Sequence, residues 1–522
     1  VWRERPDEAL ESAASAMGAI EQNESFSGRG GELSPALVDK LVSSILTQFD
    51  SRNGGFGSQP KFPHPSALCL LLQASVQRDN ATARNAFLVT LEKMARGGIY
   101  DQIAGGFHRY SVDERWVVPH FEKMLYDNTE LLRNYVHGFQ TFVSENFHHT
   151  ASEIISWLDG TMTDRERGGF YASQDADIDL DDDGDYFTWT LEEARAVLDP
   201  DEVDFASLYW DIGELGDMHH NPAKNVLHVK YSLDELASRN HGPSDLTTGE
   251  MKALLVSARH KLLDARRLRP TPFIDRTLYT GWNSMAVTAY LEAASVMRLE
   301  PQREFALRTL ARLLAEAWDG AQSLYHVIDY HDASLNPERI PGTLDDYAFT
   351  VHACIDAWLA SGNMRFYNAA TTLADAMIVR FYDRTAGAFY DTIAPANGSI
   401  PLGALTTRRK PLQDSPTPAG NPTAVSALLR IEALSSRAEY REIAEDTLAS
   451  FSGIVEHLGL YAGSYGIALV RLLTDPVQVV VVGSGSTAER LHATAMSGFG
   501  VQKTVIQLMP EQLVPGGLPP AL

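Results

Sequence analysis

The chain has 522 residues, which at about 150 residues per domain would predict three or four domains. Its 44 Lys and Arg stand against 68 Asp and Glu, and the resulting net charge of −24 argues against binding to nucleic acid or to an anionic membrane. Hydrophobic residues make up 44% of the chain, enough for large cores, whereas two cysteines are too few for a disulfide framework or a cysteine-based zinc site.

Most of the chain shows the spacing of apolar residues that is typical of helices. Strand signals are sparse, and strands are expected at 186–190, 226–229 and 477–482. In chain order, helices are expected at 6–24, 34–49, 64–76, 85–96, 119–142, 150–162, 245–263, 283–298, 303–318, 344–359, 365–381, 423–434, 440–454 and 461–473.

A short pattern of glycines followed by an aromatic residue recurs between the expected helices. Because its copies are unevenly spaced, it does not fit a stacked solenoid, which should repeat every ~34 to 47 residues. We therefore predict helical hairpins in series, with these loops on one rim, in an all-α (α/α)6 toroid over residues 1–473. The copies are Gly54-Gly55-Phe56-Gly57, Gly105-Gly106-Phe107-His108, Gly168-Gly169-Phe170-Tyr171 and Gly387-Ala388-Phe389-Tyr390.

The tail of the chain, residues 474–522, has a different pattern. A buried-strand pattern at 477–482 is followed by a helix at 486–496 and a further strand at 501–509, which predicts a small α/β appendage. Gly483, Gly485 and Ala488 fit a dinucleotide-binding G-x-G-x-x-A pattern. No acidic residue ends the next strand to bind a ribose, so we expect no nucleotide cofactor here.

The densest cluster of polar and aromatic residues lies at 97–128. We expect a helix after Pro119, so that His120, Lys123 and Asp127 share one face and Glu122 shares an adjacent face with Tyr126. A face with His, Glu, Tyr and Asp suits proton transfer and hydroxyl binding better than core packing. The alternative is a solvated, salt-bridged face.

Two further candidates lie at expected helix starts. Asp345 and Asp346 could be general acid or base groups, but Thr343 and Asp346 could equally cap the helix. Trp282, beside Asn283, could stack on a sugar or could belong to the core.

An acidic run from Asp175 to Asp185 matches only the first half of a calcium loop. Thr190 stands where such a loop requires Glu, and flanking helices are missing, so a solvated hairpin tip is favoured. The adjacent histidine pairs lack metal-ligand spacing, and we expect neither a metal nor another cofactor.

The stretch HRYSVDERWVVPHFEKMLYDN at 108–128 resembles the signature of the thioredoxin-fused proteins of the spermatogenesis-associated type. The resemblance implies a thioredoxin-like N-terminal domain followed by a six-hairpin toroid similar to N-acylglucosamine 2-epimerases and glycosidases. The thioredoxin-like part with its Cys motif is expected to be absent before Val1, so no redox activity is assigned to this chain. Further matches lie at 55–63, 168–177, 186–190, 281–283 and 344–348.

The resulting hypothesis is a carbohydrate-active enzyme, either a glycosidase or a sugar epimerase, and the alternative is a non-catalytic module that binds a glycan or a protein. We expect a small-molecule or oligosaccharide substrate and a cytoplasmic location, and the oligomeric state stays open. Hydrolysis would use Asp127, Asp175 and Asp345 or Asp346, and epimerisation would use His108 and His120, with Arg109 on the developing oxyanion. The remaining candidates are Glu122 as a catalytic residue and Trp116, Tyr126, Trp282, Asn283 and Tyr347 as sugar-binding residues.

Overall fold

The computed structural model describes residues 5, 11–12, 30–178, 183–238, 246–331, 339–394, 408–514 and 516–522. The helix expected at 6–24 lies almost entirely outside these residues. In the part of the chain that is described, every helix is too short or too polar to cross a lipid bilayer.

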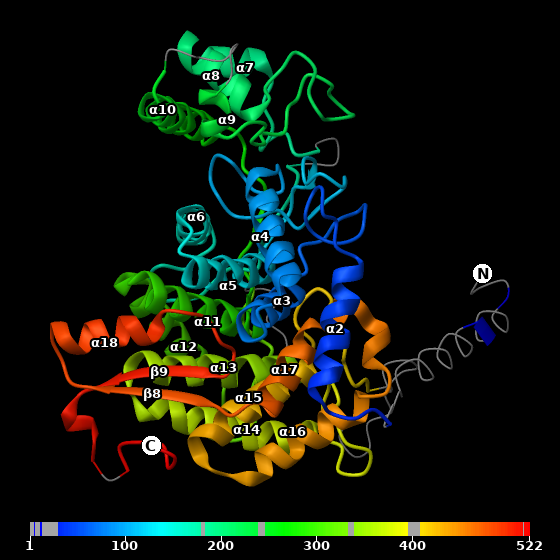
Figure 1. Ribbon diagram of the computed structural model, residues 1–522, viewed down its shortest axis with the longest axis vertical. Helices are drawn as coiled ribbons and strands as arrows, with labels where there is room; N and C mark the ends of the chain where they lie inside the picture. The colour runs from blue at the N-terminus through cyan, green and yellow to red at the C-terminus, as the bar shows by residue number, and fades with distance from the viewer. Residues whose placement is uncertain are drawn as a thin grey trace.

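Within the described residues, six helices form a closed inner ring, in which each contacts the next and α17 returns to α3 (Figure 1). Each outer helix packs against the inner helix that precedes it in the chain, and α2 packs against α17. The six hairpins confirm the predicted (α/α)6 toroid. The inner helices are α3 (Pro65–Gln77), α5 (Leu125–Phe142), α11 (Thr280–Met297), α13 (Leu344–Ser361), α15 (Gly420–Ser435) and α17 (Gly463–Leu473), and the outer helices are α2 (Pro35–Thr47), α4 (Ala81–Arg96), α6 (Glu145–Thr161), α12 (Glu300–Glu316), α14 (Met364–Phe381) and α16 (Ala438–Phe451).

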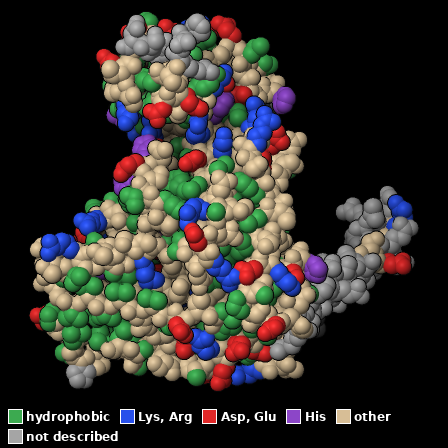
Figure 2. Space-filling model, viewed as in Figure 1, with side chains coloured by type: hydrophobic (Ala, Val, Ile, Leu, Met, Phe, Trp, Pro, Cys, Tyr) green, Lys and Arg blue, Asp and Glu red, His purple; other side chains and the backbone are tan. Residues whose placement is uncertain are grey.

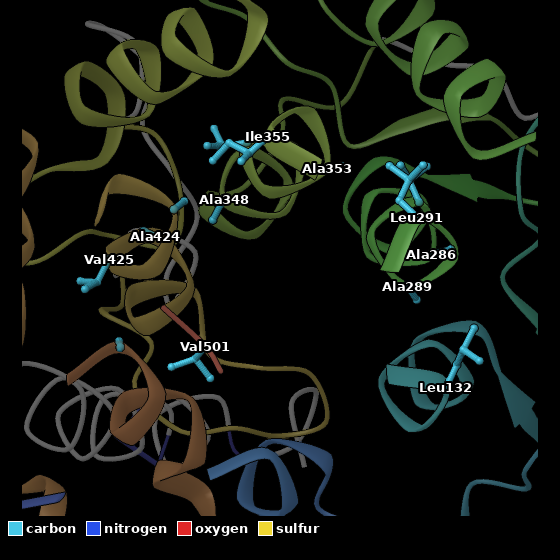
Figure 3. Close-up of a cluster of buried hydrophobic side chains, with 14 of the residues drawn as sticks. Leu132, Ala286, Ala289, Leu291, Ala348, Ala353, Ile355, Ala424, Val425 and Val501 are labelled. Carbon is cyan, nitrogen blue, oxygen red and sulfur yellow. The ribbon is translucent and has the colours of Figure 1, made fainter. Parts of the chain in front are cut away.

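The outer and inner helices differ in how many of their sides are buried, because their patterns of apolar residues differ. Outer helix α12 buries one stripe, formed by Phe305, Thr309 and Leu313, and carries charged residues elsewhere. Inner helix α13 buries residues on nearly all sides, as a helix with neighbours all round must. Apolar side chains of the inner helices, among them Leu132, Ala289 and Ala348, pack around the ring (Figure 3).

Four outer helices of the described chain end in the same loop, Asp-x-x-x-Gly-(Gly or Ala)-Phe, which begins at Asp50, Asp101, Asp164 and Asp383. In each copy the first Gly donates its N–H to the Asp carbonyl at 2.8–2.9 Å, and its φ lies between 71° and 88°. Such a φ strains any residue with a Cβ, so the glycine is required by the turn. These loops occupy the rim where the inner helices begin.

An asparagine on the following inner helix holds three of these loops. Asn128 accepts the N–H of Phe107 at 2.6 Å and donates to the Phe107 carbonyl at 2.9 Å. Asn421 does the same with Phe389 at 2.7 and 2.9 Å. The third asparagine, Asn283, is described with the candidate site.

Four helices that lie between α6 and α11 in the chain form a separate lobe at one end of the molecule (Figure 1). Its helices pack around a core that includes Trp189 and Trp210. Arg266 anchors the lobe to the rim through a bidentate pair with Asp101 at 2.8 and 3.1 Å. The helices are α7 (Leu191–Val197), α8 (Pro200–Trp210), α9 (Leu233–Ala237) and α10 (Thr248–Arg266).

The described strands of the toroid and lobe are short. Two expectations from the sequence were wrong, one about strands and one about the start of a helix. The strands expected at 186–190 and 226–229 reduce to one isolated bridge between Trp189 and Asn225. The helix expected from Pro119 begins only at Leu125, because 119–124 is extended and pairs with neighbouring strands. The strands are β1 (Tyr110–Ser111), β2 (Pro119–His120), β3 (Lys123–Met124), β4 (Ser173–Gln174), β5 (Ile274–Asp275), β6 (Leu278–Tyr279) and β7 (Val327–Asp329).

The tail forms the predicted α/β appendage: β8 (Val477–Val482) and β9 (Lys503–Leu508) pair in parallel, joined by α18 (Ser486–Met496). Val477, Val480 and Val482 of β8 are exposed, and hydrophobic side chains gather at the lower left of Figure 2, in the region of β8 and β9. The appendage contacts the inner ring through α13 and β9. The domain boundary at residue 473 stays a prediction.

Candidate functional site in the toroid lumen and at its rim

Five of the sequence-predicted site residues are fully engaged in holding the fold. His108 is buried between the rings of Phe121 and Phe187, with its Nδ1 2.7 Å from the Phe121 carbonyl, and burial lowers its pKa to about 3. Trp116 is fully buried and donates its indole N–H to the Asn53 carbonyl at 3.1 Å. Neither side chain can reach a ligand, so both assignments are corrected to core positions.

Two more of these five residues hold loops. Asn283 clamps Phe170, accepting its N–H at 2.7 Å and donating to its carbonyl at 3.0 Å, as Asn128 and Asn421 do in their own loops. Tyr347 takes the same place on α13, where its hydroxyl accepts the Leu324 N–H at 2.8 Å. Both are fully buried, so we withdraw them as sugar-binding residues.

Asp346 is committed to capping, as the alternative interpretation expected. Its carboxylate accepts the N–H groups of Gly281 and Thr343 at 2.8 Å and faces Nδ1 of His326 at 2.8 Å. With 1% of its surface exposed, it holds the start of α13 against α11. It therefore has no free oxygen for catalysis.

Asp345, its neighbour, is only partly buried. Burial and the negative charges of Asp346 and Asp391 raise the pKa of Asp345 to about 7. It remains an acid–base candidate at the start of α13.

The structure brings most of the other candidates together at the rim. Arg109 donates to Glu122 at 3.1 Å, and Nδ1 of His120 lies 3.9 Å from the same carboxylate. His120 stacks on Tyr110 in the β1–β2 pair, so it does not share a helical face with Asp127. We define the rim cluster as Arg109, His120, Glu122, Tyr126, Asp127, Asp175 and Trp282.

Asp127 is the most perturbed acid of the rim cluster. Its Oδ2 is buried and has no hydrogen-bond partner within the described chain. Burial, reinforced by Glu122 and opposed by Arg109, raises its pKa to about 8. A carboxyl of this kind is protonated at neutral pH and can donate a proton.

Asp175 and the two aromatic residues complete the rim cluster. Burial and the charges of Glu122 and Asp275 raise the pKa of Asp175. Tyr126 and Trp282 meet edge to face with ring centres 4.9 Å apart. They pack with Met285 and Phe349 in one small apolar cluster.

Below this apolar cluster, a cavity of about 500 Å³ runs through the toroid lumen. Met285 and Phe349 of the apolar cluster line it, as do Pro65 and Ser464 at the starts of α3 and α17. Val501 of the tail also lines it, and Figure 3 shows Val501 among the inner helices. None of the thirteen sequence-predicted site residues lines this lumen cavity.

One side of the lumen cavity carries an ion-pair network, which we call the acidic half: Glu130, Arg133 and His137 of α5 and Glu292 of α11. Arg133 binds Glu292 at 2.8 and 3.1 Å and Glu130 at 3.1 Å, and Nε2 of His137 lies 3.2 Å from Glu292. Although burial alone would raise the pKa of Glu292, Arg133 and His137 hold it well below its ordinary value. Glu292 is therefore ionised.

The other side, which we call the basic half, consists of His352 and Asp356 of α13, Arg430 of α15 and Arg471 of α17. Arg430 pairs with the Asp356 carboxylate and lies 2.8 Å from Nδ1 of His352, whose Nε2 lies 3.2 Å from the Thr423 carbonyl. Burial and the two arginines hold the pKa of His352 well below its ordinary value. The imidazole is therefore neutral.

Sequence reasoning missed all of these lumen residues. A signal was present: His352 and Asp356, Arg430 and Arg471 are isolated polar residues inside otherwise apolar helices. Such residues are costly in a core unless they are paired or face a cavity.

The described residues contain no group of three or more His, Cys, Asp or Glu side chains placed to hold a metal ion. Cys69 of α3 lines the lumen cavity, and burial raises the pKa of its thiol to about 12, so it stays protonated. Asp179, Asp181 and Asp182 of the acidic run lie outside the described residues, and the calcium-loop hypothesis stays a prediction.

Known proteins were compared with the chain by sequence. No protein-family model matches it. Spermatogenesis-associated protein 20 of Mus musculus is 30% identical over 463 residues, which cover 80% of this chain and 56% of the mouse protein. The Homo sapiens protein is 29% identical over 86% of this chain and 60% of its own length. The chain thus spans less than two thirds of these mammalian relatives.

Solved structures were compared by fold. A D-mannose isomerase superposes with a TM-score of 0.50 at 8% identity, covering 80% of this chain and 84% of the isomerase. A glycoside hydrolase family 76 α-mannanase from Bacteroides thetaiotaomicron gives a TM-score of 0.48 at 8% identity, covering 84% and 97%. At such identities the likeness to the isomerase shows the toroidal fold alone.

Proposed function

Because the chain is a homologue of spermatogenesis-associated protein 20 built on an (α/α)6 toroid, we propose that it is a carbohydrate-active enzyme that isomerises or epimerises a small sugar in its lumen cavity. The observation that carries the proposal is that two histidines of the inner helices, His137 and His352, line one cavity of about 500 Å³, which His492 of α18 also lines. This volume falls within the range of small-ligand sites. The histidines are His137 and His352 rather than the expected His108 and His120.

His137 serves as the general base. Glu292 lies at its Nε2, which fixes that nitrogen as the protonated one and leaves Nδ1 to accept a proton. The ionised Glu292, held by Arg133, then stabilises the imidazolium that forms. In this arrangement the carboxylate orients the base and the arginine holds the carboxylate, which is typical of an activated base.

The basic half supplies the positive charge that stabilises the intermediate and the second proton-transfer group. When a proton leaves the carbon beside a sugar carbonyl, the electron pair moves onto the carbonyl oxygen, and the enediolate needs nearby positive charge. Arg430 provides it, in the role first given to Arg109. His352 accepts from Arg430 at Nδ1 and so carries its proton on Nε2, and it becomes the second proton-transfer group when this N–H moves from the Thr423 carbonyl to an oxygen of the ligand.

Substitution of the two histidines tests the proposal. We expect His137→Gln and His352→Gln each to reduce sugar isomerisation by about 10²- to 10⁴-fold, the usual contribution of a general acid or base. The assay screens aldoses and ketoses in D₂O and follows both product formation and deuterium uptake beside the carbonyl. His260→Gln, an exposed position on α10, is the matched control. Equal turnover by all three variants would contradict the assignment.

A glycosidase at the rim is the second candidate, because Asp127 has the raised pKa that a general acid needs. Its test is the hydrolysis of aryl glycosides by Asp127→Asn, Glu122→Gln and His120→Ala. If these variants lose hydrolysis while the lumen variants keep it, the rim is the active site. If every variant and the parent protein bind glycans without turnover, the chain is a binding module.

A further inference from the structure

We propose that the ligand of the lumen cavity is a polyhydroxylated compound with an anionic group, a carboxylate or a phosphate, which is bound by Arg471. This inference rests on the proposed function, because it names the class of substrate for the same cavity. It is carried by an arginine that has no acidic partner among the described residues.

Of the arginines that line the lumen cavity, Arg298 and Arg471 have no ion pair with a described residue, and Arg298 is exposed whereas Arg471 is partly buried. Arg133 and Arg430 each form ion pairs with a carboxylate, whereas Arg471 has no ion pair with any described residue. Its Nε is buried and has no hydrogen-bond partner in the described chain. Leaving a partly buried cation unpaired is costly, so the position calls for a negative charge, which no described residue supplies through an ion pair.

The carboxylate of the basic half that could pair with Arg471 already binds another arginine. Asp356 engages both Nη atoms of Arg430, with one of the two contacts at 3.4 Å. The basic half therefore holds two guanidiniums for one carboxylate. Burial, with repulsion from Arg430, lowers the pKa of Arg471 to about 9, and a bound anion would relieve this repulsion.

The ring order places the two halves across the lumen cavity. In the closed ring α3–α5–α11–α13–α15–α17, α17 is three positions from α11, and α15 is three positions from α5. Arg471 and Arg430 therefore face Glu292 and His137. A ligand could place its anionic group against Arg471, its carbonyl oxygen against Arg430 and its hydroxyls against the acidic half.

The attraction must be local, because the whole chain carries a net charge of −24. A protein of that charge repels anions at long range, so it gains an anionic ligand only through direct contacts inside a shielded cavity. Guanidinium groups bind carboxylates and phosphates bidentately, which gives such a contact both strength and orientation.

Calorimetric titration with four probes tests the inference: D-glucuronate, D-glucose 6-phosphate, D-glucose and inorganic phosphate. We expect one or both anionic sugars to bind at least about tenfold more tightly than glucose. Arg471→Met should weaken that binding by about 10- to 100-fold and leave glucose binding unchanged. Arg471→Lys should restore part of it, since the charge remains.

Arg267→Met is the matched control, because Arg267 is exposed on α10 and pairs only with Asp264. Near-ultraviolet circular dichroism confirms that the Arg471 variants keep the native fold. Preference for glucuronate identifies the carboxylate and preference for glucose 6-phosphate identifies the phosphate.

Two results would overturn the inference. Glucose might bind as tightly as the charged sugars and remain unaffected by Arg471→Met, which would leave a neutral-sugar enzyme and the proposed function intact. Inorganic phosphate could match glucose 6-phosphate, which would show an anion site without sugar recognition. If no sugar of either kind binds or reacts, the proposed function fails as well.

Discussion

At the scale of single residues, Asp127 illustrates what burial does to a carboxyl group. Its Oδ2 lies inside the protein without a hydrogen-bond partner among the described residues, and its pKa is raised to about 8. The acid is protonated in the folded protein at pH values where the unfolded chain would ionise it. Asp127 therefore makes stability depend on pH.

The sign of this dependence follows from linkage. Between the ordinary Asp value of 3.8 and about 8, the folded state binds more protons than the unfolded state, so stability falls as pH rises through this interval. Asp127→Asn replaces the acid with a neutral amide of similar shape, so this loss of stability with rising pH disappears. We expect its melting temperature to exceed that of the parent by a margin that grows from pH 5 to pH 8.

Thermal melts of both proteins at the two pH values provide the measurement. Asp264→Asn, at an exposed position paired with Arg267, is the control and should show a constant difference. A margin for Asp127→Asn that shrinks toward pH 8 would mean that the carboxyl is ionised in the folded protein.

The polar and aromatic residues of the rim could be predicted from the sequence, but the directions in which their side chains point could not. The polar cluster at 97–128 was found, and several members meet, as Arg109 and Glu122 do at 3.1 Å. His108 and Trp116 from the same stretch point into the core. Whether a polar side chain faces a cavity or a neighbouring backbone depends on segments distant in sequence, here Phe187 and Asn53.

At the scale of elements, the rim loops share one construction. In addition to the glycine turn and the asparagine clamp, a cation binds the loop: Lys410 donates to the Asp383 carboxylate at 2.8 Å and to the Gly387 carbonyl at 2.6 Å. Lys123 binds Asp101 and Gly105 in the same way, at 2.8 and 2.9 Å. The Gly-aromatic pattern was visible in the sequence, whereas the clamp and the cation come from other segments.

The clamp gives a stability prediction. Asn128→Ala removes three hydrogen bonds and leaves the buried N–H of Phe107 without a partner. We expect the free energy of unfolding to fall by about 2–4 kcal/mol, measured by urea denaturation.

Asn146→Ala, an exposed position on α6, is the control for this variant and should stay within about 0.5 kcal/mol of the parent. A comparable loss in both variants would show that the clamp adds nothing to the ordinary cost of an asparagine substitution.

At the scale of the whole molecule, the seam between the first and last inner helices closes the toroid. Gly463 of α17 lies so close to α3 that a Cβ there would come within 2.5 Å of the backbone nitrogen of Ala67. Real Cβ atoms do not approach so closely, so the seam depends on glycine. The same closure sets the ring order that places Arg471 opposite Glu292.

Gly463→Ala should therefore strain the seam. We expect it to destabilise the protein by about 1–3 kcal/mol and to lower the melting temperature measured by calorimetry. Gly249→Ala on α10 is the control, because among the described residues its new Cβ would have only one neighbour, at 3.8 Å. There the alanine should leave the stability unchanged or slightly raise it. Equal melting temperatures for both variants would contradict the tight seam.

From neighbouring residues alone, the sequence predicts the helices, the turns and the strands of the tail. Helix periodicity, glycine turns with positive φ and the parallel strands of the tail depend on neighbouring residues, so the toroid and its appendage could be predicted. The start of α5 at Leu125 could not, because 119–124 is held extended by β1 and β4. Only the closed ring decided which polar residues form the lumen cavity, since residues as far apart as Cys69 and Arg471 come together only when α17 meets α3.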